Sequence, residues 1–258
     1  MPADRVVLVT GASSGIGWAT ALAFAALGAR VIAVARRSEQ LAALAEGATT
    51  LPGAILPVTA DVTRAEDMAH AVERAREAWG RLDVLVANAG IGQRGSLVDA
   101  PWADLEVVLR TNIDGVLHSV RAAVPLMRQG GRGGHIILIS SISGAAPAPF
   151  AAVYGASKSF INGLGRALRG ELRRDNIRVT TFLVGQTHTG FAQTRRGQPG
   201  RVAAWLPTMS AETVARRIVR AVDHPRNVVV LRLIDRAFLL AATVAPGLLD
   251  HLQWRVYR

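Results

Sequence analysis

The chain has 258 residues, of which 50% are apolar and 19% charged, and this balance predicts a packed globular core and argues against disorder. It contains no cysteine, which excludes disulfides, thiolate catalysis and cysteine-ligated metal sites, and its six histidines show no ligand-like spacing, so we expect no metal. The net charge of +11 permits an anionic partner: nucleic acid, an acyl carrier protein, a membrane surface or a phosphorylated cofactor. The arginines are scattered without a basic block, so we expect no nucleic-acid partner. We favour the interpretation that the charge reflects the use of arginine in place of lysine across the whole chain.

Apolar runs along the chain are short. The first, Val6–Thr10, is too soon broken by glycine for a signal peptide. The best candidate for a membrane span, Ala237–Leu249, is interrupted by Thr243, Pro246 and Gly247 and falls short of the ~20 residues required. We therefore expect a soluble, cytoplasmic protein.

The first elements along the chain form a strand, a glycine-rich turn, a helix and a second strand. The β-branched segment Arg5–Thr10 predicts a buried strand, and the apolar-periodic segment Trp18–Leu27, ended by Gly28, predicts a helix before the strand Arg30–Ala35. Glycines in such a turn let the backbone approach a pyrophosphate, whose charge the helix N-terminus stabilises. The turn predicts dinucleotide binding by Gly11, Ser13, Ser14, Gly15, Ile16 and Gly17.

The end of the second strand indicates which dinucleotide binds. An NAD-binding chain places an acid there for the ribose 2′-hydroxyl, whereas this chain has Ala35 followed by Arg36 and Arg37. Guanidinium groups offer paired, charge-assisted donors to a 2′-phosphate. We expect NADP(H) rather than NAD(H); two arginines at a helix start are the alternative.

Strand and helix patterns alternate along the rest of the chain. Strand character is found in Ala54–Thr59, Leu82–Ala87, His135–Ser140, Ile177–Leu183 and Asn227–Leu231. Helical character is found in Ser38–Glu46, Arg64–Trp79, Asp104–Arg110, Ile113–Arg128 and Tyr154–Asp175. The alternation predicts a parallel sheet with right-handed crossovers, and because no linker or repeat interrupts it, we expect residues 1–258 to form one α/β domain.

Tyr154 and Lys158 are the most unusual pair in the chain, because Lys158 is its only lysine and Tyr154 one of two tyrosines. Residues four apart share one helix face, so the phenol and the ammonium group point into the same space. At ~4 Å and an effective dielectric of ~20 their attraction is ~4 kcal/mol, which would move the phenol pKa from ~10 towards neutrality. Such a phenol can exchange a proton with a carbonyl oxygen. A half-buried tyrosine beside a solvated lysine is the alternative.

These motifs together resemble the short-chain dehydrogenase/reductase family over about Arg5–Val230. Their order and spacing match that family at Thr10-Gly11-Ala12-Ser13-Ser14-Gly15-Ile16-Gly17, Asn88-Ala89-Gly90, Asn112, Ser141 and Tyr154-x-x-x-Lys158. The resemblance implies a Rossmann-type, doubly wound parallel sheet of about seven strands with helices on both faces, and a nicotinamide cofactor.

The resemblance also implies residue roles. Tyr154 is the general acid in carbonyl reduction, Lys158 lowers its pKa and binds the nicotinamide ribose, Ser141 donates to the substrate oxygen, and Asn112 holds a relay water. Asp61 and Val62 resemble the adenine contacts, and Asn88 and Gly90 support the central part of the cofactor. Ordinary capping roles for Ser141, Asn112 and Asp61 are the alternative.

The chain departs from the family pattern after its sixth strand. The family usually has Pro-Gly there, where this chain has Val184 and Gly185. Loss of the proline loosens the turn. Gly185, Thr187 and Thr189 remain the expected contacts of the nicotinamide carboxamide region. A smaller departure is Ala87 at the first position of the asparagine motif.

Segments that follow the fourth, fifth and sixth strands face substrate in this family. Because most of their residues are apolar, we expect a lipophilic ketone, aldehyde or alcohol rather than a sugar or a charged acid. The candidate substrate contacts, besides Ser141 and Tyr154, are Gln93, Phe150, Gln186 and Trp205.

Residues 233–258 form an apolar and basic extension that we expect to be helical. It covers the substrate mouth, contacts another subunit, or lies as an amphipathic stretch on a lipid surface. By resemblance we expect a homodimer or homotetramer built on the helices Asn112–Arg128 and Tyr154–Asp175. The favoured function is an NADP(H)-dependent carbonyl reductase or alcohol dehydrogenase; a 3-oxoacyl-carrier-protein reductase and a non-catalytic NADP(H)-binding redox sensor are the alternatives.

Overall fold

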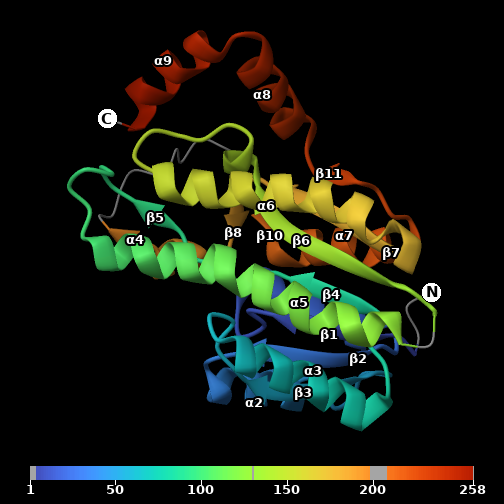
Figure 1. Cartoon of the computed structure of the whole chain (residues 1–258). Coiled ribbons are helices and arrows are strands. Elements are labelled where there is room, and N and C mark those ends of the chain that lie inside the picture. The colour runs from blue at the N-terminus through green and yellow to red at the C-terminus, as the bar shows by residue number, and fades with distance from the viewer. Residues whose placement is uncertain (1–3, 130, 198–207, 258) are drawn as a thin grey trace.

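Alternating strands and helices build a parallel sheet in the computed structural model, which describes residues 4–129, 131–197 and 208–257 (Figure 1). The strands of this sheet are β1 (Val6–Thr10), β2 (Arg30–Ala35), β3 (Ala54–Thr59), β4 (Val84–Ala87), β6 (Gly134–Ser141), β7 (Ile177–Val184) and β11 (Val228–Val230). Their order is β11-β7-β6-β4-β1-β2-β3, and every neighbouring pair is parallel. The doubly wound, seven-stranded fold expected from the sequence is confirmed.

Helices cover both faces of the sheet. The helices are α1 (Gly15–Ala25), α2 (Ser38–Glu46), α3 (Ala65–Trp79), α4 (Trp102–Leu109), α5 (Gly115–Arg128), α6 (Ala152–Glu171), α7 (Ala211–Asp223), α8 (Leu233–Val244) and α9 (Pro246–Tyr257). One apolar core joins the sheet to α3, α5 and α6, and a second joins its other face to α1, α2 and α7. Successive strand residues alternate between the two cores, so Leu8 lies in the first and Val7 and Val9 in the second.

The strand order reverses between β1 and β4, whose register pairs Leu8 with Leu85. In such a sheet the loops that follow neighbouring strands diverge to opposite faces and leave a crevice at the carboxyl ends. Gly11 follows β1 and Asn88 follows β4, so two of the expected cofactor contacts lie at this crevice.

Several elements differ from the sequence expectation. Helix α1 begins at Gly15 rather than Trp18, so the glycine turn is tighter than expected. Helix α7 was missed, although Ser210 caps it by accepting a hydrogen bond from the Thr213 N–H at 3.2 Å. Two short ribbons were also missed, because each pairs only two residues per strand and depends on tertiary contact. They are β5 (Gln93–Arg94) with β9 (Arg196–Gly197), and β8 (Thr187–His188) with β10 (Met209–Ser210).

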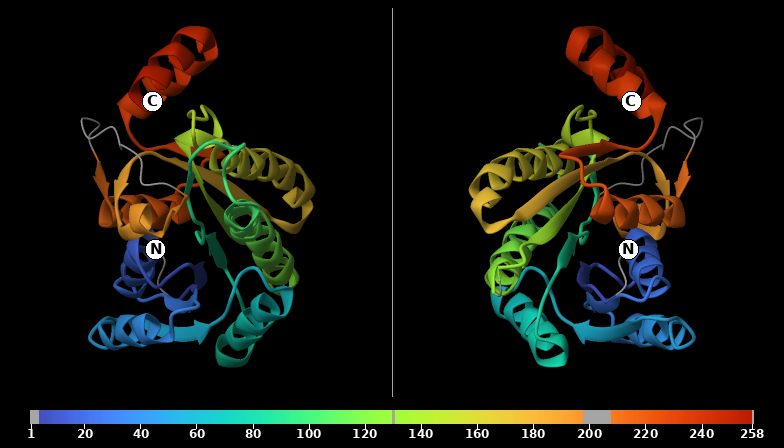
Figure 2. Two further views of the ribbon diagram at one scale, coloured as in Figure 1. Left: turned by 90° about the vertical axis from the view of Figure 1, so that its left-hand side faces the viewer. Right: turned by 90° about the vertical axis from the view of Figure 1, so that its right-hand side faces the viewer.

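Helices α8 and α9 project from one end of the molecule beyond β11 (Figure 2). Among the described residues, no helix combines the length and the apolar character needed to cross a bilayer.

Candidate active site

Tyr154, Lys158 and Ser141 meet at the carboxyl end of β6. Tyr154 and Lys158 lie one turn apart near the start of α6, and Ser141 is the last residue of β6. Two glycines permit this arrangement: a Cβ on Gly155 would lie 2.9 Å from Pro147 Cβ, and one on Gly144 would lie 2.6 Å from the Lys158 carbonyl carbon. The start of α6 can therefore pack directly on the loop that follows β6.

Lys158 is buried, with 4% of its surface exposed. Its Nζ donates a hydrogen bond of 3.0 Å to the Ile139 carbonyl oxygen and lies 5.9 Å from the centre of the Tyr154 ring. Burial lowers the pKa of Lys158 to about 8. Its ammonium group is consequently still protonated at neutral pH but close to the pH at which it becomes neutral.

Tyr154 does not show the lowered pKa expected from its lysine neighbour. Burial raises the pKa of Tyr154, while a hydrogen bond with Ser141 and the charge of Arg195 partly oppose this rise. Burial destabilises the ionised phenol by more than the Ser141 hydrogen bond and the Arg195 charge stabilise it. The Lys158 ammonium group gives no direct help, because it donates to a backbone carbonyl oxygen rather than to the phenol oxygen. The expectation that Lys158 moves the pKa of Tyr154 towards neutrality is therefore wrong for this arrangement of the two side chains.

Asn112 anchors the segment after β4 to α6. It lies in a π-helical turn, Arg110–Asp114, between α4 and α5, and such turns are frequent at functional sites. Its side-chain oxygen accepts from the Ile91 N–H at 2.9 Å, and its amide donates to the Ile91 carbonyl oxygen at 3.0 Å and to Ser157 Oγ at 2.9 Å. Ser157 in turn donates to the Tyr154 carbonyl oxygen at 2.7 Å. The Asn112 side chain thus positions backbone around the tyrosine.

The glycine-rich turn forms a cradle beside these groups. Gly15 has a φ of +56°, which favours glycine, and a Cβ on Gly17 would lie 2.6 Å from Asn88 Nδ2 and collide with the Gly11 carbonyl oxygen. Asn88 joins the ends of β1 and β4, because its Nδ2 donates to the Thr10 carbonyl oxygen at 2.9 Å. Ser14 precedes α1 without a side-chain cap, so the first N–H groups of α1 suit the pyrophosphate of a dinucleotide.

Gly90 lies where the cradle meets the tyrosine site. A Cβ there would lie 3.1 Å from Asn112 Oδ1 and 3.3 Å from Lys158 Nζ. Because no side chain fills this space, a cofactor in the cradle can extend towards Lys158.

Arginines lie at the other end of the cradle, as expected. Arg37 donates from Nη2 to Ser13 Oγ at 2.9 Å, and Arg36 forms an ion pair with Asp61 at 3.7 Å. Asp61 also accepts from the Thr63 N–H at 2.9 Å. The structure therefore brings together Arg36 and Asp61, which were expected to contact different parts of one adenosine, while Val62 is buried beneath them against Gly115.

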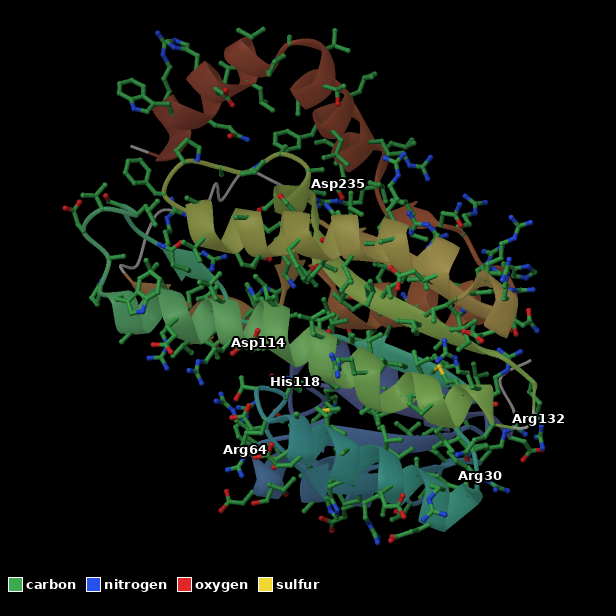
Figure 3. All side chains as sticks on the ribbon, in the orientation of Figure 1. Arg30, Arg64, Asp114, His118, Arg132 and Asp235 are labelled. Atoms are coloured by element: carbon green, nitrogen blue, oxygen red, sulfur yellow. The ribbon has the colours of Figure 1, made fainter. Side chains whose placement is uncertain are left out.

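The segment expected to hold the nicotinamide is braced by the start of α8. A Cβ on Gly185 would lie 2.6 Å from Asp235 Oδ2 and 2.6 Å from Arg232 Nη2. Arg232 and Asp235 form a double hydrogen bond of 2.8 and 2.6 Å, and Asp235 is 3% exposed. Figure 3 labels Asp235 on the first turn of α8. Sequence reasoning missed this pair, although an acid at the root of an otherwise apolar extension is a detectable signal. The buried ion pair thus packs directly against Gly185, the residue after the position where the family usually has proline.

Thr187 and Thr189 stabilise the same segment. Thr187 Oγ1 donates to the Gly185 carbonyl oxygen at 3.1 Å, and Thr189 Oγ1 accepts from the Phe191 N–H at 3.3 Å. A Cβ on Gly15 would lie 3.1 Å from Thr189 Cβ, so this segment faces the start of α1.

The expected substrate contacts are placed unevenly. Gln93 is buried in β5, Phe150 is 38% exposed with its carbonyl oxygen accepting from the Gly95 N–H at 2.8 Å, and Gln186 accepts through its carbonyl oxygen from the Met209 N–H at 3.0 Å. Trp205 lies outside the described residues. The structure adds Phe191, whose ring centre is 5.9 Å from that of Tyr154.

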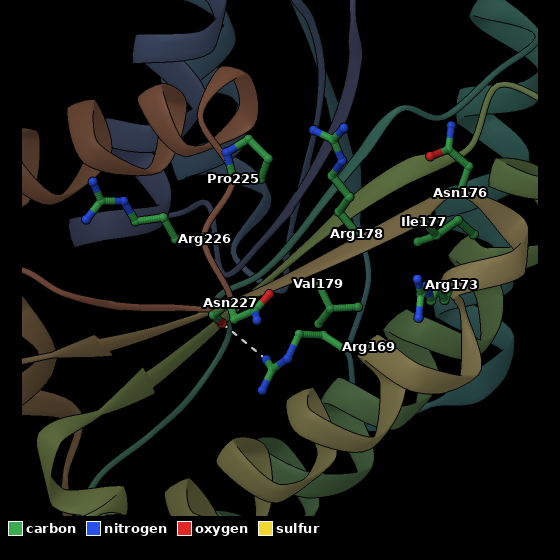
Figure 4. Close-up of a pocket in the computed structure, with 9 residues that line it drawn as sticks. All are labelled: Arg169, Arg173, Asn176, Ile177, Arg178, Val179, Pro225, Arg226 and Asn227. Atoms are coloured by element: carbon green, nitrogen blue, oxygen red, sulfur yellow. Dashed lines mark hydrogen bonds between the residues drawn. The ribbon is translucent and has the colours of Figure 1, made fainter.

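A pocket of about 350 Å³ lies at the amino end of β7 (Figure 4). Ser141 pairs with Val184 at the opposite end of that strand. Four arginines from α6, β7 and the loops line it: Arg169, Arg173, Arg178 and Arg226. Their side chains point in different directions, and Arg169 donates to the Asn227 carbonyl oxygen at 3.1 Å. This pocket shares no residue with the tyrosine site.

Comparison with known proteins identifies the family. The profile described as short chain dehydrogenase matches residues 5–200. The chain belongs to the short-chain dehydrogenase/reductase family, whose members are oxidoreductases. An uncharacterised oxidoreductase of Listeria monocytogenes is 33% identical and aligns over 87% of this chain and 93% of its own length. The 3-oxoacyl-[acyl-carrier-protein] reductase FabG of Thermotoga maritima is 36% identical over 83% of this chain and 82% of its own.

Solved structures show the same fold. A short chain dehydrogenase/reductase of Burkholderia phymatum in complex with NAD superposes with a TM-score of 0.88 at 24% identity and covers 95% of both chains. Other matching structures contain NADH or 5-hydroxy-NADP, so both kinds of nicotinamide dinucleotide occur among proteins of this fold.

Proposed function

We propose that this chain is an NADP(H)-dependent oxidoreductase that interconverts a carbonyl and an alcohol on a lipophilic small molecule. The observation that carries the proposal is the meeting of Tyr154, Ser141 and Lys158 beside the glycine cradle of residues 11–17. A cofactor in the cradle supplies or accepts the hydride. The side chains of the protein then have to bind the carbonyl oxygen and move one proton.

Tyr154 is the proton donor in the direction of reduction. Its raised pKa keeps the phenol protonated at neutral pH, so a proton is present before the carbonyl oxygen gains charge. Ser141 Oγ accepts from the Ser143 N–H at 3.1 Å, and its hydroxyl hydrogen, which interacts with the Tyr154 phenol, would be shared with a substrate oxygen bound between the two side chains. Lys158 supplies a buried positive charge that stabilises the phenolate once the proton has left.

NADP(H) is favoured over NAD(H) by charge. Arg36 is 69% exposed in its side chain and therefore accessible to a 2′-phosphate, and Arg37 lies against Ser13 of the cradle. Asp61 neutralises part of this charge, so Arg36 and a phosphate would have to share the site with one carboxylate.

A lipophilic substrate is favoured by the apolar residues around Tyr154. The Phe191 ring packs against the tyrosine ring in a tilted arrangement, with 54° between the ring planes, and Ala146 is buried in the loop that follows Ser141. The similarity to a 3-oxoacyl-carrier-protein reductase keeps that reaction as a second candidate, in which the same residues would reduce a 3-oxoacyl thioester.

The test is NADPH oxidation with a panel of aldehydes, ketones and a 3-oxoacyl thioester, in the wild type and in Tyr154→Phe. We expect turnover in the wild type and a loss of ~10²–10⁴-fold in Tyr154→Phe, with NADPH binding retained. NADPH binding without turnover of any carbonyl would instead indicate the redox-sensor alternative.

We also propose two partners, a second copy of the chain and a lipid surface. The helices α5 and α6 are proposed as the contact surface of a homodimer or homotetramer. Helices α8 and α9 are proposed to touch a lipid surface, because large apolar side chains there are 44–80% exposed: Leu233, Ile234, Leu240, Val244, Leu248, Leu252 and Trp254. Liposome flotation of the wild type against Leu240→Ser/Val244→Ser/Leu248→Ser tests the second proposal, and equal flotation of both proteins would contradict it.

A further inference from the structure

Arg195 places a positive charge next to Tyr154 that the sequence did not reveal. It lies between the 3-10 turn Gly190–Thr194 and β9, and it is half-buried. The neighbouring backbone is fixed, because the Arg196 N–H donates to the Gly92 carbonyl oxygen at 2.9 Å and β9 pairs with β5. Arg195 is therefore held by a small sheet rather than by a free loop.

The side chain of Arg195 shares its surroundings with the ring that contacts the tyrosine. A Cβ on Gly92 would lie 2.8 Å from Arg195 Cγ and 3.0 Å from Phe191 Cε1. Since the Phe191 ring also lies against the Tyr154 ring, Gly92 leaves space that the side chains of Arg195 and Phe191 both border, beside Tyr154. The charge of Arg195 reaches the phenol, where it contributes to lowering the pKa of Tyr154 against the effect of burial.

No acidic side chain of the described residues forms an ion pair with Arg195. Its neighbour Arg196 is matched by Asp104 at 3.9 Å, and Arg36 by Asp61 at 3.7 Å. The stretch 198–207 cannot supply the missing acid, because it contains neither aspartate nor glutamate. Arg195 is half-buried as a residue and carries a charge without an acidic partner among the described residues, so an anionic ligand near Tyr154 would find an available guanidinium group there.

We propose that Arg195 binds an anionic oxygen group of the substrate, a carboxylate or a phosphate, while Tyr154 and Ser141 bind its carbonyl oxygen. A guanidinium group offers two parallel N–H donors that match either anion. The substrate is then a carbonyl compound with an apolar body, which contacts Phe191, and a negative charge, which contacts Arg195. This inference rests on the proposed function. It changes the expected substrate from an uncharged lipophilic compound to one that also carries a carboxylate or a phosphate.

Paired substrates test the inference directly. Steady-state kinetics are measured with benzoylformate and its methyl ester, which differ in the charge, for the wild type, Arg195→Gln and the control Arg196→Gln. We expect Arg195→Gln to lower kcat/KM for the acid by about 10- to 100-fold and to change kcat/KM for the ester less than about threefold. Arg196→Gln should leave the ratio of acid to ester unchanged, because its charge is already paired with Asp104.

Two results would overturn the inference. If Arg195→Gln lowered kcat/KM equally for the acid and for the ester, Arg195 would assist proton transfer by Tyr154 and would not bind the negative charge of the substrate. A weaker NADPH affinity with an unchanged ratio of acid to ester would mean that Arg195 contacts the cofactor.

Binding measurements separate this inference from the proposed function. Calorimetric titration of NADP⁺-loaded protein with benzoylformate requires no turnover, and Arg195→Gln should weaken binding by about tenfold. Absence of binding to the wild type, or equal binding by both proteins, contradicts the role of Arg195 even if neutral ketones are reduced. Phenyl phosphate in the same titration identifies the preferred anion: tighter binding than benzoylformate, lost in Arg195→Gln, assigns phosphate.

Discussion

The two ends of the crevice are built by different means. The cofactor cradle between β1 and α1 is made mostly of backbone, namely glycines and the first N–H groups of a helix, and the Asn88 side chain joins the two strand ends beside it. The tyrosine end is made of side chains from distant parts of the chain, since Ser141 lies at the end of β6, Tyr154 on α6, and Phe191 and Arg195 in and just after the turn Gly190–Thr194. Backbone geometry leaves a local sequence pattern, whereas a side-chain assembly depends on packing between remote segments.

This difference implies that substitutions at the tyrosine end act on chemistry and its pH dependence, whereas those at the cradle act on cofactor affinity. The largest effect is expected at Lys158. We expect Lys158→Met to lower kcat by about 10²–10³-fold, because the substitution removes the buried positive charge on α6 that stabilises the Tyr154 phenolate. Activity of the wild type should also fall as the pH rises above about 8, because deprotonation of Lys158 then removes the charge. Stopped-flow measurement of NADPH oxidation across the pH range checks both, and Arg169→Gln, at the far end of α6, is the control.

Arg36→Asp tests the cradle. We expect the KM for NADPH to rise by about 10- to 100-fold, because the new carboxylate lies next to Asp61 and both repel a 2′-phosphate, while the KM for NADH changes little or falls. Arg30→Asp, at the opposite end of β2, is the matched control and should change neither constant. An unchanged KM for NADPH in Arg36→Asp would remove the NADP(H) preference from the account.

Asp235→Asn tests whether the C-terminal extension is part of the cofactor site. We expect the KM for NADPH to rise by about three- to tenfold with a smaller change in kcat, because the substitution removes the negative charge of Asp235 from the buried pair that packs against Gly185. Asp175→Asn breaks the exposed ion pair with Arg128 and serves as the control. Equal changes in the two variants would mean that the pair at Gly185 has no specific role.

The smallest effect on activity is expected for substitution of His135, at the amino end of β6. Burial, followed by the charges of Arg178 and Arg5, lowers the pKa of His135 to about 4. An unfolded chain takes up the proton near pH ~6.5 and the folded protein only near 4, so stability is full above about 6.5 and falls by about 3 kcal/mol as the pH is lowered to about 4.

Chemical unfolding at pH 7 and at pH 4.5, with wild type and His135→Gln, measures this dependence. We expect the variant to lose less stability on acidification and to keep its activity at pH 7. A parallel loss in both proteins would assign acid sensitivity to other groups. Glutamine can retain the hydrogen bond that His135 Nε2 makes with Thr180 Oγ1 at 2.8 Å, which limits other damage.

The sequence predicted the cradle and the tyrosine motif because both are local. The strand–turn–helix pattern around Gly11–Gly17 and the spacing of Tyr154 and Lys158 require only neighbouring residues. The raised pKa of Tyr154 could not be predicted, since it depends on how much protein surrounds the phenol and on where the Lys158 side chain is directed. Arg195 and Asp235 are single charged residues in segments without a recognisable motif, and only tertiary contact gives them a place in the site.

The central claim is that Tyr154 is the proton donor and that its acidity depends on the charge brought into a buried site. Ultraviolet titration of Tyr257→Phe, in which Tyr154 is the remaining tyrosine, measures this directly in the free protein and with NADP⁺ bound. We predict that Tyr154 ionises above pH ~10 in the free protein and at a clearly lower pH with NADP⁺, whose nicotinamide ring is positively charged. Ionisation near neutrality in the free protein, or at the same pH in both states, would contradict the account.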